Sequence, residues 1–360
     1  MSSASYVYTF PSVRGVQAGR VFYISQCPVR LLPRLFSFTD GDLPPEMRAQ
    51  RALNPKRVPE IASYITENRD SYVFSAITAS VDSDVTFTPN PPGQDHLGDL
   101  HVPMDARFII NDGQHRHAAY AAALELDPTL GDETVGVVFF IDQGLSRSQQ
   151  MFADLNRHSV KPSPSIGVLY DHRDELADLT RQIVQQVRAL STLVEREKTT
   201  LAPKSRKLFT LSAIHHCHRA LTAGIDAARR ASLAVEFWDA TFAAFGDWRS
   251  VAEGQLAAGE VRQEMIHSHG TVLHALGRAG NAFERQTDGD WARFTEVVGG
   301  IDWRRAPDSP WNGRVVIAGH VSKSNQSTAL ASSYIKSALG LDLSVDEVRF
   351  EEALKGSVNS

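Results

Sequence analysis

The sequence predicts a two-part chain, with an α/β domain over residues 1–163 followed by a mainly α-helical domain over residues 164–360. The N-terminal part alternates short β-branched and aromatic stretches with amphipathic helical stretches. From about Ser165 onward, long segments with a 3.6-residue period dominate, without a convincing strand between them. The stretch at 161–165, Lys-Pro-Ser-Pro-Ser, is typical of a boundary, and a length of 360 residues fits two domains of ~150 residues each.

The N-terminal elements follow from local composition. Strands are expected where β-branched and aromatic residues concentrate, at Val16–Ile24, Tyr72–Val81, Val85–Thr88, Arg107–Ile110 and Val135–Ile141. Helices are expected at Lys56–Asn68, Gln114–Leu126 and Ser146–Asn156. The second and third strands are expected to pair as a hairpin, and residues 88–100, with three prolines and two glycines, to form a loop.

The C-terminal part is expected to consist of long helices. The 3.6-residue period extends through four segments, Ile166–Leu190, Thr210–Ala228, Ala231–Phe245 and Val251–Leu276. Such a pattern predicts a helical bundle rather than a second sheet.

Composition indicates an ordinary globular protein of the cytoplasm. The chain is 42% hydrophobic and 22% charged, and its apolar runs are far shorter than the ~18 residues of a membrane span. The first ten residues have neither a basic nor an apolar region of the kind found in secretion signals. Two cysteines, Cys27 and Cys217, fit a reducing compartment, and Cys27 is expected to be a buried small hydrophobe.

Positive charge is concentrated in one stretch of a chain whose net charge is −5. Residues 198–219 contain no acidic residue, and the cations Lys198, Lys204, Arg206 and Lys207 lie before an expected helix. These four residues are the predicted DNA-binding residues, because lysine and arginine neutralise backbone phosphates. The alternative is a solvated basic loop.

A second basic stretch is a weaker candidate for nucleic-acid binding. It includes Arg305, Arg314 and Lys323, and its tryptophans, Trp303 and Trp311, could stack on bases or cover the core. The chain has no recognisable helix-turn-helix, so no base-reading residue is assigned.

The most informative stretch runs from a buried strand into a helix of small residues at 109–119. Asp112 lies where an N-cap is expected, so the N–H groups of Gly113, Gln114 and His115 would be unpaired at the helix start. Such a helix start binds anions, and Arg116 could clamp a phosphate. The alternative is that Asp112 only caps the helix, while His115 and Arg116 make structural bonds.

Histidines at 215 and 218 share one helix face, which could suggest a metal site. No Cys-x-x-Cys pair or carboxylate lies nearby at a usual ligand spacing, so no metal is assigned.

The sequence Asp-Gly-Gln-His-Arg at 112–116, between a strand and a helix, resembles the signature of the DGQHR class of proteins. Arg57–Asn68 and Phe152–Asn156 also match this class, while Arg14–Arg20 and Pro44–Arg51 resemble the DndB family in particular. The resemblance covers most of the chain. It implies a DNA-binding negative regulator of the operon that installs sulfur in DNA, with the double-stranded promoter as its partner.

The corner at 112–116 is also similar to the phosphate-binding corner of the ParB and sulfiredoxin superfamily, which implies a ParB/sulfiredoxin-like N-terminal domain. Gln114 stands where sulfiredoxin has its nucleophilic cysteine. An amide cannot form the thiolate-based intermediates of that chemistry, so reduction of a sulfinic acid is excluded at this position.

An enzymatic alternative stays open. The corner at 112–116 could hold ATP with Mg²⁺ in a nucleotide hydrolase or phosphotransferase, with Asp112 as the obvious carboxylate for the metal. No Walker-type loop occurs elsewhere in the chain to share this task. The sequence leaves a homo-oligomer open.

Overall fold

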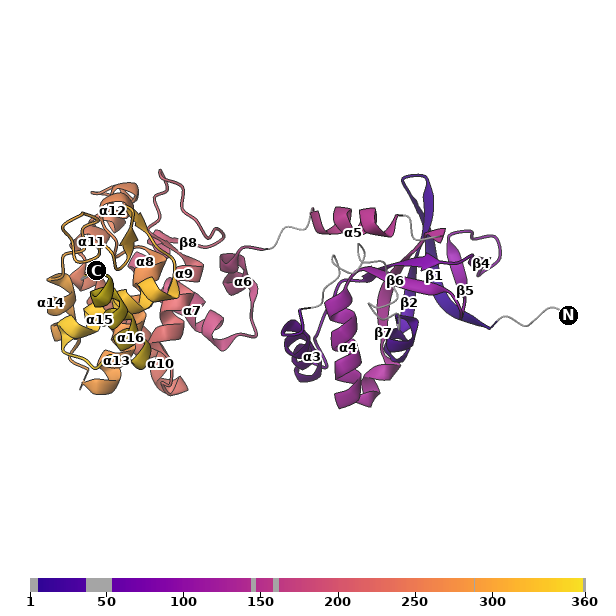
Figure 1. The fold of residues 1–360 in the computed structure, drawn as a ribbon, viewed down its shortest axis with the longest axis horizontal. Coiled ribbons are helices and arrows are strands. Elements are labelled where there is room, and N and C mark those ends of the chain that lie inside the picture. Colours follow the sequence, from indigo (N-terminus) through magenta and orange to yellow (C-terminus); the bar gives the residue numbers. More distant parts are fainter. Residues whose placement is uncertain (1–5, 37–53, 144–146, 158–161, 288, 359–360) are drawn as a thin grey trace. The chain divides into compact units, whose positions relative to one another are not determined.

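The computed structural model describes residues 6–36, 54–143, 147–157, 162–287 and 289–358. The chain forms two compact units, Met1–Val160 and Lys161–Ser360 (Figure 1). The N-terminal unit contains a sheet and the C-terminal unit is mostly helical, which confirms the predicted mixed α/β fold class. Ser146 and the family-like stretch Pro44–Arg51 lie outside the described residues.

A seven-stranded sheet in the order β4-β5-β1-β2-β7-β3-β6 forms the N-terminal unit (Figure 1). Neighbouring strands are antiparallel, except that β3 and β7 are parallel. In chain order the strands are β1 (Val7–Gln17), β2 (Arg20–Pro28), β3 (Ile77–Asp82), β4 (Thr86–Pro89), β5 (Leu97–Pro103), β6 (Arg107–Asp112) and β7 (Thr134–Ile141).

The strand predicted at Val16–Ile24 is wrong, because a hairpin turn divides it. Ala18 and Gly19 join β1 to β2 with φ angles of +50° and +73°. Two positive φ angles are the signature of the type I′ turn, whose twist matches that of antiparallel strands. The β-branched residues on both sides of the turn hide it in the sequence pattern.

The predicted hairpin between the second and third strands is also wrong. β3 lies between β7 and β6, and β4 pairs with β5 instead. β5 itself begins inside the predicted loop at 88–100. Its buried residues Leu100 and Val102 alternate with less buried neighbours, and this period of two was the overlooked signal.

Helices cover the N-terminal sheet at α1 (Leu32–Leu35), α3 (Arg57–Glu67), α4 (Gln114–Leu126) and α5 (Ser148–Arg157), with short 3₁₀ turns at Val29–Leu31 and Pro128–Asp132. α3 and α4 lie side by side (Figure 1), and both were predicted within one residue of their bounds. Their buried side chains join the sheet's aromatic residues in one hydrophobic core.

The helical unit contains α6 (Pro164–Tyr170), α7 (Glu175–Gln186), α8 (Arg188–Leu193), α9 (Leu211–Leu221), α10 (Ala227–Ala244), α11 (Gly246–Ala252), α12 (Ala258–Glu264), α13 (Gly270–Gln286), α14 (Trp291–Gly299), α15 (Asn325–Leu339) and α16 (Val345–Val358). Four two-residue strands pair as β8 (Val194–Glu195) with β9 (Phe209–Thr210), and β10 (Val316–Ile317) with β11 (His320–Val321).

The long predicted helices are divided in the structure. Ile166–Leu190 becomes three helices, because Asp174 accepts hydrogen bonds from the N–H groups of Leu176 and Ala177 and starts α7 anew. Val251–Leu276 is similarly divided among α11, α12 and α13. A shared apolar face continued across these breaks, so the 3.6-residue period alone did not reveal them.

α13 packs against both α9 and α15 and is almost wholly buried on those sides. Gly277 lies against α9 so closely that a Cβ there would be 2.4 Å from the Cys217 carbonyl oxygen. The two helix backbones therefore touch at this point, and only glycine fits.

We expect Gly277→Ala to destabilise the helical unit by about 2 kcal/mol or more, because the obstacle is backbone and cannot rotate away. Denaturant unfolding followed by tryptophan fluorescence tests this, since all five tryptophans lie in the helical unit. The matched control is Gly167→Ala in α6, where the new Cβ meets nothing within 4 Å. The control should be neutral or up to ~1 kcal/mol more stable through helix propensity. Equal stability of the two variants would contradict the close-packing account.

Candidate functional site

The corner between β6 and α4 is built around Gly113. This residue is the N-cap of α4 with a φ of +106°, which favours glycine. A Cβ here would also lie 3.2 Å from Cγ1 of Ile77. The first helical hydrogen bond runs from the N–H of His117 to the Gly113 carbonyl at 2.9 Å. The N–H groups of the three residues between them therefore precede the helical hydrogen-bond pattern.

The prediction that Asp112 is the N-cap is wrong. Gly113 holds that position, and no side chain caps the helix there. Asp112 is the last residue of β6, and its Oδ2 lies 2.5 Å from Nη2 of Arg116. The left-handed Gly113 takes the N-cap position itself, so the Asp112 carboxylate contacts Arg116 in the first turn of α4 instead of the backbone N–H groups.

Arg116 connects the start of α4 to the segment before β3. Its Nη1 donates to Oγ of Ser75 at 2.6 Å, to the Ala76 carbonyl at 2.9 Å, and to the Ser75 carbonyl. With Asp112 on Nη2, both ends of the guanidinium have protein partners, and the side chain is only 15% exposed. A phosphate would have to compete with these partners. The geometry therefore matches the alternative in which Arg116 makes structural bonds.

The neighbours of Arg116 also make internal bonds. Nε2 of Gln114 donates to the Ile110 carbonyl at 3.2 Å, and Nε2 of His115 accepts from the N–H of Asn54 at 3.0 Å. Partial burial, and then the charge of Arg57, lowers the pKa of His115. This favours the neutral ring that the Asn54 bond requires.

The buried Asn111, which precedes Asp112, was not predicted as part of the site. Its amide donates to Oγ of Ser80 at 2.8 Å and accepts from Oγ of Ser148 at 2.7 Å. These bonds attach α5 to the corner. In the sequence, the signal for this role was an asparagine in a buried strand, directly before the five-residue motif.

We expect Arg116→Ala to destabilise the N-terminal unit by about 3 kcal/mol, because it leaves a carboxylate and two carbonyls without their charged donor. Asp112→Asn keeps the shape and the backbone bonds of Arg116, so it should cost about 1 kcal/mol. Amide hydrogen exchange of β3 and α4 measures both. If Arg116→Ala exchanges like wild type, the guanidinium does not hold this corner together.

The predicted DNA-binding residues lie on the loop 196–208, which connects β8 to β9. Lys198, Lys204 and Arg206 are exposed. Lys207 is half-buried, and its Nζ donates to the Thr192 carbonyl at 2.6 Å. The structure therefore presents three of the four cations to solvent and uses the fourth to attach the loop to α8.

Arg262 of α12 holds the same loop from the other side. Its Nη2 donates to the carbonyls of Ala202 and Pro203, each at 2.9 Å, and its Nη1 donates to the Lys207 carbonyl. A Cβ on Gly259 would lie 2.5 Å from the Pro203 oxygen, so α12 and the loop are in direct contact. Arg262 was not predicted as part of the site, because it is more than fifty residues away from the loop in the chain.

A groove of about 1040 Å³ lies beside this loop. Its charged lining residues are the four cations Lys204, Arg206, Arg262 and Arg305, with a single carboxylate, Glu260. The groove extends the positive surface of the loop toward α12.

The tryptophans and Arg314 of the second basic stretch are engaged within the helical unit. Trp303 and Trp311 are 5% and 0% exposed and stack on each other in the core with ring centroids 4.8 Å apart. Arg314 is ion-paired with Glu351. Lys323 remains exposed.

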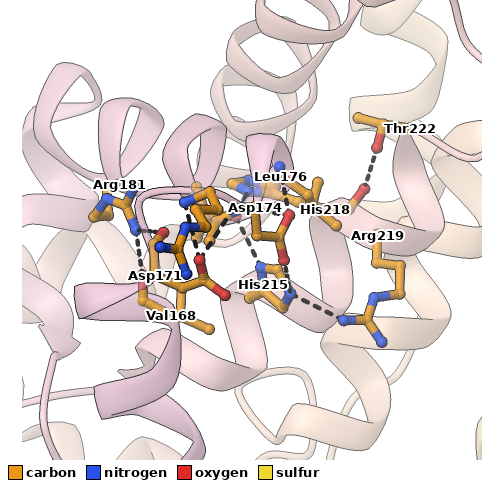
Figure 2. A network of polar contacts seen from close by, with 12 residues as sticks. Val168, Asp171, Asp174, Leu176, Arg181, His215, His218, Arg219 and Thr222 are labelled. Atoms are coloured by element: carbon orange, nitrogen blue, oxygen red, sulfur yellow. Dashed lines mark hydrogen bonds and ion pairs between the residues drawn. The ribbon is translucent and has the colours of Figure 1, made fainter. Parts of the chain in front are cut away.

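The histidines of α9 take part in a polar network with α7 (Figure 2). Nε2 of His218 accepts from Trp238 at 2.8 Å, and its Nδ1 lies 3.0 Å from Oγ1 of Thr180. Burial lowers the pKa of His218 to about 3, so the ring is neutral. His215 lies near Asp174, and its Nε2 accepts from Arg219 at 3.0 Å. Both rings thus have protein partners on this network.

Both cysteines are buried. Cys27 is 0% exposed in the sheet core, and burial raises its thiol pKa to about 12. This confirms that Cys27 behaves as a small hydrophobic residue. The thiol is protonated and inaccessible, so it is poorly suited to redox sensing.

Across the described part of the chain, the helices are too short or too polar to cross a lipid bilayer. Within the same residues, His, Cys, Asp and Glu side chains do not gather in threes around a possible metal position.

A family model described as DNA-sulfur modification-associated matches residues 10–342, nearly the whole chain. The chain therefore belongs to the DndB family, as its resemblance predicted. Curated proteins and solved structures give no significant match. The likeness of the corner to ParB and sulfiredoxin thus stays a prediction.

Proposed function

We propose that this protein is a cytoplasmic DNA-binding negative regulator of a DNA sulfur-modification operon, and that loop 196–208 contacts the phosphates of the promoter. Membership of the DndB family supports a role in DNA sulfur modification. The observation that carries the proposal is the group of three exposed cations, Lys198, Lys204 and Arg206, on a loop fixed by Arg262.

The bonds that hold loop 196–208 in place should raise its affinity for DNA. Each ordered backbone residue costs about 1–2 kcal/mol of conformational entropy, and a loop already held by Arg262 and Lys207 avoids most of that cost on binding. Neutralising phosphates releases counterions from DNA, which supplies the favourable free energy. The loop therefore provides a preorganised phosphate-binding surface.

Two carboxylates lie at the base of this surface, Glu195 at the end of β8 and the exposed Glu197 directly before Lys198. The Glu195 carboxylate accepts from the N–H of Glu197 at 3.0 Å and from that of Lys198 at 3.4 Å. These backbone bonds lower the pKa of Glu195 and engage its charge at the base of the loop.

We expect the protein to bind promoter duplex more tightly than random duplex, by ~10³ or more for a dedicated regulator. Lys204→Glu should weaken both equally, by about tenfold at 0.15 M salt, because phosphate contacts carry no sequence information. The salt dependence of its affinity should also be less steep. Fluorescence anisotropy with labelled duplexes measures these effects.

The matched control is Lys355→Glu, the same charge change at an exposed lysine of α16. It should bind duplex nearly as wild type does. If Lys204→Glu and Lys355→Glu behave alike, the loop is not the interface. Equal binding of promoter and random duplex, together with unchanged operon transcription in a deletion strain, would overturn the regulatory proposal.

Nucleotide hydrolysis at residues 112–116 stays a prediction. The metal would need Asp112, which is ion-paired with Arg116. Since Arg116→Ala should also loosen the corner, Asp112→Asn is the sharper variant for a Mg²⁺-dependent hydrolysis assay.

A further inference from the structure

A second pocket, of about 750 Å³, lies in the helical unit where α9, α13 and α15 begin, and it shares Leu201, Arg262 and Arg305 with the groove beside loop 196–208. Its lining includes Arg262, Arg305, Lys323 and four histidines, and none of the lining residues is aspartate or glutamate. In a chain of net charge −5, a pocket whose charged lining residues are all cations indicates an anionic ligand.

The starts of α9, α13 and α15 differ in whether a side chain caps them. Oγ1 of Thr210 caps α9, and Oγ of Ser324 caps α15. The N-cap of α13 is His269, which makes no side-chain cap bond, because its Nε2 donates to the Arg262 carbonyl at 2.9 Å. The next residue, Gly270, is exposed, so an anion can approach the backbone N–H groups of this 17-residue helix.

Ser268 supplies an independent observation. It lines the pocket directly before this helix start and is 4% exposed, and its Oγ has no hydrogen-bond partner among the described residues. A buried hydroxyl without a partner costs about 1–3 kcal/mol. A ligand oxygen in the pocket would satisfy it.

The rings of His216 and His274 stack on the pocket wall with centroids 6.3 Å apart. Burial, and then the charges of His216, Arg278 and Arg219, lowers the pKa of His274 to about 4. The wall is therefore neutral and partly aromatic, while the cations lie elsewhere around the pocket. A planar group could lie against such a wall.

We propose that this pocket binds a phosphate group at the start of α13. Ser268 donates its hydroxyl, Gly270 and Thr271 donate backbone N–H groups, and Arg305 and Lys323 supply the countercharge. The volume falls within the ~300–1,000 Å³ typical of small-ligand sites, so a mononucleotide fits. Loop 196–208 borders the pocket through Thr199–Leu201, but the exposed cations proposed to contact the promoter are not among its lining residues.

Calorimetric titration of the full chain with inorganic phosphate and with AMP tests the site, with Ser268→Ala, Lys323→Gln and the control Lys355→Gln. Phosphate should bind wild type and Lys355→Gln alike. Ser268→Ala and Lys323→Gln should bind at least fivefold more weakly. In the absence of phosphate, Ser268→Ala should have an unfolding midpoint equal to or above that of wild type, since it removes an unpartnered hydroxyl.

Adding duplex DNA to the titration distinguishes the two sources of phosphate. Competition would assign the bound group to the DNA backbone, and its absence to a free nucleotide. Either result supports the site. The proposal is overturned if neither phosphate nor AMP binds at millimolar concentration, or if both bind the two pocket variants as tightly as wild type. These outcomes do not depend on whether Lys204→Glu affects promoter binding.

Discussion

The close approach of α13 to α9 at Gly277 is the constraint on which the helical unit depends. Because this glycine has no Cβ, the helix backbone touches the Cys217 carbonyl. One turn further along, Gly280 lies against Phe237 and Leu221, where a Cβ would be within 3.0 Å. Two glycines on one face thus set the distance between the central helices.

That distance also positions the chemistry at the helix starts. Toward the N-terminal ends, α13 stays close to α9, since a Cβ added at Gly270 would lie 3.4 Å from that of Ala213. The capped start of α9 and the uncapped start of α13 therefore border one pocket. The close packing of α9 and α13 therefore also determines where the polar groups at the starts of these helices lie.

The cations of this protein have two different roles. Arg116 and Arg262 each use the guanidinium fork to hold several carbonyl groups of a neighbouring segment. Lys198 and Lys204, by contrast, are exposed on the loop that Arg262 fixes. Arg116, Arg262 and Lys207 hold neighbouring segments in place, while Lys198, Lys204 and Arg206 provide the charge that a nucleic acid can contact.

The sequence predicted what depends on neighbours in the chain. α4, the glycine corner and the exposed cations of loop 196–208 all follow from local composition. It could not predict contacts between distant segments. The bonds of Arg116 to Ser75 and of Arg262 to Pro203 span about forty and sixty residues, and neither leaves a periodic signal. The β1–β2 turn was missed because Ala18 adopts a positive φ, which its residue type does not suggest.

The central claim is that nucleic acid contacts the helical unit at loop 196–208 rather than at the corner 112–116. Hydrogen–deuterium exchange of the full chain, with and without promoter duplex, tests it most directly. The account predicts slower exchange over loop 196–208 on adding DNA, with unchanged exchange at Gly113–Arg116. Protection confined to that corner, with the loop unaffected, would contradict it.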